Sequence, residues 1–498
     1  MTDHYPVLIV ILPFLFAFVV SGAAWVKKSL CFPLTVVGMG LSAGLSACLL
    51  GRVATTGLVE YRMGGWETPW GIGYHVDYLN ALVVTVVTVL AFINLIATRK
   101  NVVEETPEKA GAFYSLYLLF IVGLTGIVLT GDLFNLYVLL EVASLTSYAL
   151  IGMGNGRAPM SALNYLFVGT VGGCFYLLGV GYLYIMTGSL NMVDVATLLP
   201  QMYHSSAIVM AFIFCMVGVG IKMAFFPLHM WLPNAYGFAP TAAGSLIAPL
   251  MTKVMVYVLI RLMLTVFSVD FAFEILKMGD PMVWLSSLAI VAGAVFALAQ
   301  KNLKRMFCYI IVSEIGYMMG GAWLGNNAGM TGAILHIFND AIMTLCLFLC
   351  AGSIYYRVRG LELDRLKGLF SKMPVTMACL VAGALSIIGV PPTCGFFSKW
   401  YLISGGLEAG QYGFVAALLF SSLVNVVLFF RVIEISYYGD FEDHHGHGSS
   451  GEAVMEAPAS MLVPLLIVSI GLIVVGLYTG GIVNHLINPL LLKQGFLG

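Results

Sequence analysis

The apolar positions of this chain run together in long stretches instead of alternating or recurring on one helical face. Fourteen of these stretches approach the length of about 20 residues that an α-helix needs to cross a bilayer. They lie near 5–26, 30–50, 77–98, 113–130, 132–153, 161–187, 205–238, 240–265, 282–299, 303–324, 329–352, 374–404, 412–434 and 459–481. The pattern predicts an all-α polytopic membrane protein with a single membrane domain over residues 1–498.

The composition supports this class. Hydrophobic residues make up 60% of the chain and charged residues only 9%, whereas a soluble domain carries about 25% charged residues. The loops are too short for a catalytic domain, and they contain no glycine-rich phosphate loop. The nine cysteines form no Cys-x-x-Cys pair, and the segment from Asp443 to His447 is interpreted as an exposed polar loop. We therefore expect no cofactor, no metal and no nucleic-acid partner, and any redox chemistry would belong to another subunit.

The basic residues are divided unequally between the two sides of the membrane. With the N-terminus outside, fifteen of the 23 Lys and Arg residues fall in cytoplasmic loops. Five fall on the other side, namely Arg52, Arg62, Arg261, Lys277 and Lys493. This separation follows the positive-inside rule. It predicts that both termini lie on the non-cytoplasmic side of the cell inner membrane.

The three remaining lysines, Lys222, Lys253 and Lys399, lie inside apolar stretches. A lysine at the bilayer centre costs roughly 2.5–3.5 kcal/mol on insertion scales, so three of them indicate that the protein moves ions or protons. Glu141 lies at mid-depth in the fifth stretch, where we expect it to pair with Lys222. Loss of either partner would strand a buried charge at a cost of roughly 3–5 kcal/mol. The pair is therefore a candidate charge switch.

A second group of polar residues lies further along the chain. His336 and Asp340 are four residues apart, hence on one helix face. We expect them to connect Lys253 to Lys399 through water, and Glu314 is a further candidate for this relay.

Each of these residues also has a plainer structural interpretation. Glu141 and Lys222 could form an ion pair that only locks two helices together. Lys253 and Lys399 could extend along the helix to reach the membrane interface. A polar contact between helices would account equally well for His336 and Asp340, so these alternatives stay open.

Prolines interrupt the seventh and the twelfth stretch. The breaks are at Pro227, Pro233, Pro391 and Pro392. Each break frees backbone groups that lipid cannot satisfy, and paired breaks in two halves are typical of inverted-repeat transporters. Because the broken stretches are five apart, the sequence predicts five-helix repeats over 113–265 and 282–437.

Five sequence motifs carry a resemblance to a known family. They are Gly131-Asp-Leu-Phe-Asn-Leu-Tyr-Val-Leu-Leu-Glu141, Phe226-Pro-Leu-His-Met-Trp-Leu-Pro233, Ala239-Pro-Thr241, Thr252-Lys-Val254 and Gly389-Val-Pro-Pro392. In combination they resemble the antiporter-like subunits of Mrp-type cation/proton antiporters, respiratory complex I and membrane-bound hydrogenases. The strongest likeness is to the Mrp D subunits, and it extends over about residues 75–435.

The resemblance implies fourteen core helices, two inverted five-helix repeats with broken helices 7 and 12, and proton passage along a buried polar axis. By match, Glu141 is the acidic partner on the fifth helix and Lys222 is the modulated lysine on the seventh. Lys253 matches the central lysine of the eighth helix, and Lys399 the terminal lysine of the twelfth. The implied partners are other membrane subunits, the lipid bilayer and protons, with Na⁺ as the candidate second ion.

Several positions depart from the family pattern. Asp340 and Thr344 stand where many members have histidine and lysine, and Glu314 stands where histidine or glutamine is common. Asn234 and Tyr236 replace a usual aspartate and histidine. These changes alter the charge of the relay and leave the choice of ion open.

We therefore expect a proton-translocating subunit of a multi-subunit Mrp-type Na⁺/H⁺ antiporter complex. One alternative is a proton-pumping membrane subunit of a complex I-like or membrane-bound hydrogenase-like oxidoreductase. Another is a passive membrane scaffold subunit.

Overall fold

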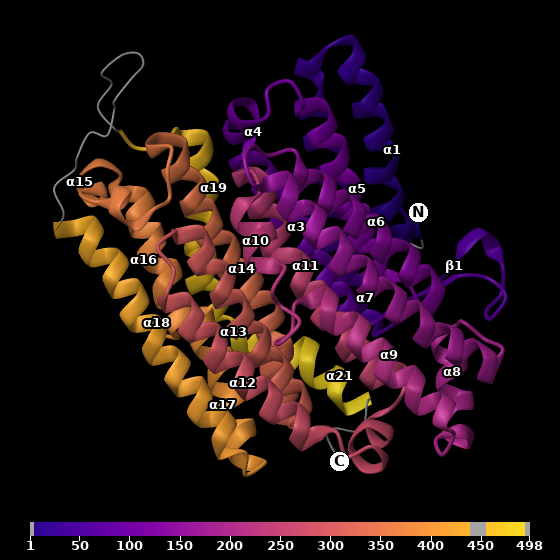
Figure 1. The fold of residues 1–498 in the computed structure, drawn as a ribbon. Helices are drawn as coiled ribbons and strands as arrows, with labels where there is room; N and C mark the ends of the chain where they lie inside the picture. The colour runs from indigo at the N-terminus through magenta and orange to yellow at the C-terminus, as the bar shows by residue number, and fades with distance from the viewer. Residues whose placement is uncertain (1–3, 439–454, 494–498) are drawn as a thin grey trace.

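The computed structural model describes residues 4–438 and 455–493, most of which are helical. Long helices pack side by side, with the earliest helices, in indigo, at one flank of the bundle and α18 (Tyr412–Tyr438), in orange, at the other (Figure 1). The polar segment from Asp443 to His447 lies outside the described residues.

The helices of the first half have the following bounds. They are α1 (Tyr5–Val26), α2 (Cys31–Thr56), α3 (Tyr78–Ala97), α4 (Arg99–Glu105), α5 (Ala110–Leu129), α6 (Leu133–Gly152), α7 (Ala158–Thr187), α8 (Met192–Leu198), α9 (Ser206–Met223), α10 (Leu232–Phe238) and α11 (Thr241–Arg261). The second half contains α12 (Gly279–Leu298), α13 (Leu303–Trp323), α14 (Asn327–Val358), α15 (Leu369–Lys372), α16 (Pro374–Ile388), α17 (Cys394–Glu408), α18 (Tyr412–Tyr438), α19 (Ala459–Leu477), α20 (Thr479–Ile482) and α21 (Asn488–Lys493).

Among the described residues, 12 helices are long and apolar enough to cross a membrane. The other two predicted spans coincide with α13 and with the pair α16 and α17. Helix α13 carries Lys304, Arg305 and Glu314, which lower its hydropathy, and the pair consists of two 15-residue helices. The all-α membrane fold is confirmed, and the count of fourteen spans stays a prediction.

Both proline-bearing stretches are interrupted in a similar way. Helix α9 ends at Met223, and Ala224 then adopts a left-handed conformation with φ of 62° before α10 begins. Helix α16 ends in the same manner at Ile388, and the φ of 91° at the next residue, Gly389, favours glycine. Five to eight residues separate the helix ends at each break. These matching breaks are consistent with the two predicted repeats, which stay a prediction.

The structure also contains a small β-hairpin that the sequence analysis does not predict. Strand β1 (Val59–Arg62) pairs with β2 (Gly73–Val76) in antiparallel register, with Val59 opposite Val76. Val59, Tyr74 and Val76 are buried against the helices, whereas Glu60 points outward. The alternation of apolar and polar positions suits a strand, but the apolar runs on either side hide so short a signal.

Helices α11 and α14 form the centre of the fold and contact each other. In the most apolar part of α11, 100% of the residues are buried, and in that of α14, 94% are buried. Charged side chains on these two central helices must therefore find their partners inside the protein.

Polar residues cap several neighbouring helices. Asp132, for example, accepts a hydrogen bond from the Asn135 amide at 2.7 Å at the start of α6.

Candidate functional site

The first charged pair lies beside the break between α9 and α10. Lys222, the penultimate residue of α9, donates to Glu141 Oε1 at 2.9 Å and to Ser144 Oγ at 2.8 Å. The lysine side chain is fully buried, whereas the Glu141 side chain is 22% exposed. The structure thus contains the expected contact between Glu141 and Lys222, and the carboxylate of this pair is partly exposed.

The second pair joins the two central helices. Lys253 Nζ on α11 lies 2.8 Å from Asp340 Oδ2 on α14, and both side chains are buried. Lys253 also donates to Thr344 Oγ1 at 3.2 Å, and Thr344 donates to Asp340 Oδ1 at 2.9 Å. The three groups close a ring of polar contacts in an apolar interior. Lys253 is held inside the protein and does not extend to the membrane interface.

The third pair consists of Glu314 on α13 and His336 on α14. Glu314 Oε2 lies 2.5 Å from His336 Nε2, and neither side chain has measurable exposure. The other ring nitrogen, Nδ1, lies 2.8 Å from Ser398 Oγ on α17. The histidine therefore bridges a buried carboxylate and a hydroxyl next to Lys399 in the chain.

Lys399 is bound at the second helix break. Its Nζ donates to the Ile387 carbonyl at 2.6 Å and to Ser422 Oγ at 3.2 Å. It also lies 4.8 Å from the centre of the Tyr317 ring, which suits a cation–π contact. Pro391 and Pro392 lie in the interruption that frees this carbonyl. The lysine thus donates a hydrogen bond to a backbone carbonyl that lipid could not satisfy.

The first break, at Pro227 and Pro233, is satisfied in a different way. Trp231 Nε1 donates to the Ile221 carbonyl at 3.0 Å. Pro233 occupies the first turn of α10, where a missing amide hydrogen costs little. An aromatic donor at this break takes the place that an ammonium group holds at the other.

The predicted residues therefore separate into distinct contacts. His336 and Asp340 share one face of α14, but they have different partners. Asp340 binds Lys253 directly, whereas His336 contacts Ser398, the residue before Lys399 in the chain. The expected link between Lys253 and Lys399 through both residues stays a prediction.

Arg261 has a buried partner that the sequence analysis leaves unassigned. The sequence places it on the outward side, near the end of the predicted stretch 240–265, and in the structure it is the last residue of α11 and is buried. Its guanidinium binds Asp77 through Nη1 at 2.8 Å and Nη2 at 2.9 Å, and Nη2 also donates to Asn80 Oδ1 at 2.7 Å. The spacing of Lys253, Tyr257 and Arg261 by four residues could have indicated this polar face of α11.

Lys304 differs from its prediction in the same way. It counts as a cytoplasmic loop residue in the sequence, but it is buried at the start of α13. Its Nζ donates to the Ala239 carbonyl at 2.5 Å. It lines a polar cavity of about 360 Å³ together with Glu105, whose carboxylate accepts hydrogen bonds from the amide and hydroxyl of Thr241. We call this space the α10–α13 cavity. A charged residue at a helix end is easily mistaken for a loop residue.

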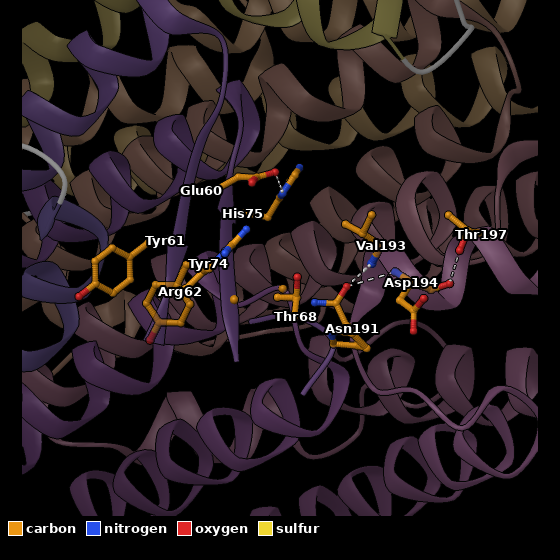
Figure 2. A pocket seen from close by; sticks show the side chains of 13 residues that line it. Glu60, Tyr61, Arg62, Thr68, Tyr74, His75, Asn191, Val193, Asp194 and Thr197 are labelled. Carbon is orange, nitrogen blue, oxygen red and sulfur yellow. Dashed lines mark hydrogen bonds and ion pairs between the residues drawn. The ribbon is translucent and has the colours of Figure 1, made fainter. Parts of the chain in front are cut away.

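A second hollow, of about 290 Å³, lies between the β1–β2 hairpin and α8 (Figure 2). Its polar groups are engaged in local structure. Glu60 lies 3.4 Å from His75, and Asn191 accepts hydrogen bonds from the amides of Val193 and Asp194, which caps α8. None of the predicted relay residues lines it. Within residues 4–438 and 455–493, no cluster of three or more His, Cys, Asp or Glu side chains could hold a metal ion.

Known proteins resemble this chain over nearly its whole length. The sequence model of a family described as "NADH:quinone oxidoreductase/Mrp antiporter, TM" matches residues 130–425. The N subunit of the NADH-quinone oxidoreductase of Desulforudis audaxviator is 42% identical over 98% of this chain and 98% of its own length. The D subunit of the Na(+)/H(+) antiporter of Bacillus subtilis is 28% identical over 89% of this chain and 90% of its own length. Among solved structures, a chain of the membrane-bound sulfane sulfur reductase, an archaeal respiratory membrane complex, superposes with a TM-score of 0.88 at 27% identity, covering 99% of this chain and 96% of that one.

Proposed function

Because this chain belongs to the NADH:quinone oxidoreductase/Mrp antiporter membrane family, we propose that it is a proton-translocating subunit of an Mrp-type Na⁺/H⁺ antiporter complex. The observation that carries this proposal is the row of buried charged contacts. These contacts are Glu141 with Lys222, Asp340 with Lys253, Glu314 with His336, and Lys399 at the second break.

Buried carboxylates that already hold a cationic or protonatable side chain suit protons better than metal cations. Na⁺ would have to displace Lys253 from Asp340, because the ammonium occupies the carboxylate at 2.8 Å. A proton needs no such displacement. When Asp340 takes up a proton, it no longer compensates the lysine charge, and Lys253 more readily gives its own proton away. Alternating charge in neighbouring pairs would carry protons through the centre of the fold.

A second candidate is supported by the sequence identity. The relative named as part of an NADH-quinone oxidoreductase is 42% identical, whereas the relative named as part of a Na(+)/H(+) antiporter is 28% identical. In that case the same contacts would pump protons within a complex I-like or hydrogenase-like oxidoreductase. Moving one charge against 100 mV takes roughly 2.3 kcal/mol, which would come from redox chemistry in a partner instead of a Na⁺ gradient.

The proposal extends to the location of the chain. We place it in the cell inner membrane, with other membrane subunits as partners and both termini on the non-cytoplasmic side. The separation of Lys and Arg residues supports this orientation. A single accessible cysteine introduced near the C-terminus should react with a membrane-impermeant reagent only from the non-cytoplasmic side.

The test is to isolate the native complex, identify its subunits by mass and record its absorption and paramagnetic spectra. In proteoliposomes, an imposed Na⁺ gradient should move protons if the complex is an antiporter. Iron–sulfur, nickel or flavin signals, with proton flux driven by an electron donor, would establish the second candidate instead. Absence of proton flux under both driving forces would contradict both and leave a passive scaffold.

A further inference from the structure

A cavity of about 450 Å³ lies at the end of the bundle where α12 begins and α13 ends. Sites for small molecules commonly have volumes of about 300–1,000 Å³, with mostly apolar walls and a few polar groups. The apolar lining residues here are Val269, Phe273, Val283 and Leu324. None of the predicted relay residues lines this space. We call it the α12–α13 cavity.

Two side chains of opposite charge line the α12–α13 cavity without a partner. They are Glu274 and Lys277, and neither forms an ion pair or a side-chain hydrogen bond among the described residues. Asp280, the third charged lining residue, is already engaged, because it accepts a hydrogen bond from Gln411 at 2.6 Å. The cavity therefore offers one free carboxylate and one free ammonium group. A ligand that carries both charges suits this pair better than a simple anion or cation, which one of the two side chains would repel.

Trp323, the last residue of α13, adds an unpartnered donor to the lining. Its side chain is only 1% exposed, yet its indole N–H donates to no group of the described residues. The ring of Phe273 packs against it with the ring centres 5.5 Å apart. Buried N–H groups nearly always have an acceptor. An acceptor on a ligand in the cavity would supply the one that this donor lacks.

Exposed aromatic residues indicate that the α12–α13 cavity lies at the level of lipid headgroups. Trp284 follows Asp280 by one turn of α12 and is exposed. A side chain at Gly413 would meet the Trp284 ring at 2.9 Å, so this ring lies beside the start of α18, next to exposed Tyr412. Trp and Tyr gather at the membrane–water interface of membrane proteins. Leu288, one further turn along α12, is also exposed and begins a surface suited to acyl chains.

We propose that the α12–α13 cavity binds an aminoethyl phosphate group, carried by the lipid phosphatidylethanolamine. Lys277 and the Trp323 indole donate to the phosphate oxygens, and the lipid ammonium donates to Glu274. The acyl chains pass Trp284 and lie along α12. Phosphatidylglycerol has the phosphate but no ammonium, so it would leave Glu274 facing a like charge. This inference does not depend on which ion the complex moves.

The test uses phosphatidylethanolamine with a photoreactive diazirine in one acyl chain. The intact complex is reconstituted in phosphatidylcholine vesicles that contain this lipid and is illuminated, and labelled peptides are identified by mass. We expect labelling of α12 near Leu288. Glu274→Gln and Lys277→Gln should each lower this labelling at least fivefold. Labelling of the other helices serves as the internal standard.

Two exposed residues outside the cavity lining provide matched controls. Glu408 is the last residue of α17 and directly precedes Ala409, which lines the cavity. Lys100 is an exposed lysine on α4. Glu408→Gln and Lys100→Gln should label within about twofold of the wild type. Wild-type labelling in both Glu274→Gln and Lys277→Gln would overturn the inference. Absence of α12 labelling in the wild type would also overturn it, and would mean that another subunit covers the cavity.

Headgroup selectivity separates a binding role of Glu274 from a loosened fold. Wild-type α12 should be labelled at least fivefold more by the ethanolamine lipid than by phosphatidylglycerol with the same photoreactive chain. Glu274→Gln should reduce this preference to less than about twofold, because it removes both the partner of the ammonium and the repulsion of the anionic lipid. A preference that is unchanged in Glu274→Gln would contradict the assigned contact.

A soluble competitor distinguishes the lipid from a free phosphoester of the same chemistry. Excess glycerophosphoethanolamine should leave the labelling of α12 unchanged, because the acyl chains hold the lipid beside the cavity. Complete competition would assign the α12–α13 cavity to a free phosphoester and overturn the lipid assignment.

Discussion

Lys253 and Asp340 form an ion pair of 2.8 Å between α11 and α14, the two most deeply buried of the 12 candidate membrane helices among the described residues. Thr344 bonds to both partners and fixes their orientation. Burial of either ion alone would be costly, so the two charges depend on each other. The proposed proton transfer would act on this pair.

Lys253→Ala should abolish coupled transport while the complex still assembles. The substitution leaves Asp340 buried without its cation, at a cost of roughly 3–5 kcal/mol unless the carboxylate takes up a proton. A neutral Asp340 keeps the helices packed but ends the exchange of protons. Transport is measured with a pH-sensitive dye in proteoliposomes, with exposed Lys100→Ala as the control. A normal rate in Lys253→Ala would contradict this role.

The Glu141 and Lys222 pair separates a transport role from a structural one. Glu141→Gln strands the buried ammonium of Lys222 and should lower both the Tm and the transport rate. The double variant Glu141→Gln with Lys222→Met removes both charges, so we expect the Tm to recover. Transport should stay at least tenfold below the wild type. Recovery of transport in the double variant would instead favour a scaffold.

How much of this site the sequence could predict depends on what each inference needs. The buried lysines were predictable, because a charge within a long apolar run is visible in the chain itself. The partner of Lys253 was not assigned, because that choice depends on which face of α14 packs against α11. His336 and Asp340 share that face, but they have different partners, because α13 packs beside His336 and supplies Glu314 as its partner.

Two charges whose burial the sequence does not show lie near helix ends. Arg261 counts as a charge of the outward side and Lys304 as a charge of a cytoplasmic loop, but tertiary packing buries both. Their partners, Asp77 and the Ala239 carbonyl, come from segments distant in the sequence. Hydropathy depends only on the residues next to a charge in the sequence. It therefore does not show which distant residue compensates that charge in the fold.

Glu314→Gln tests whether the third pair takes part in transport. Glutamine keeps the shape of the side chain and a hydrogen bond to His336, but it cannot take up a proton. We expect at least a tenfold fall in transport rate with little change in Tm. Exposed Glu408→Gln on α17 is the matched control and should transport normally. An unchanged rate in Glu314→Gln would make the pair a structural contact between α13 and α14.

The two helix breaks should differ in their response to loss of the capping donor. Lys399→Met removes the donor to the Ile387 carbonyl, and Trp231→Phe removes the donor to the Ile221 carbonyl. Each loss leaves a buried carbonyl unsatisfied and should cost about 1–3 kcal/mol of stability. Only the lysine variant also removes a proton-carrying group, so only it should abolish transport. Equal transport losses at matched Tm would show that both donors act through backbone geometry alone.

Asp77→Asn should reveal how far the fold depends on the buried arginine at the end of α11. Asparagine still caps the start of α3, because its side-chain oxygen can accept the Leu79 and Asn80 amides as the aspartate does now. The substitution therefore removes the charge and spares the cap. Arg261 would lose the bidentate contact and stay buried, at a cost of roughly 3–5 kcal/mol. We expect a clear fall in Tm, whereas Asp280→Asn, at an exposed position on α12, should leave the Tm unchanged. A normal Tm in Asp77→Asn would mean that Asn80 and Tyr257 alone compensate the guanidinium.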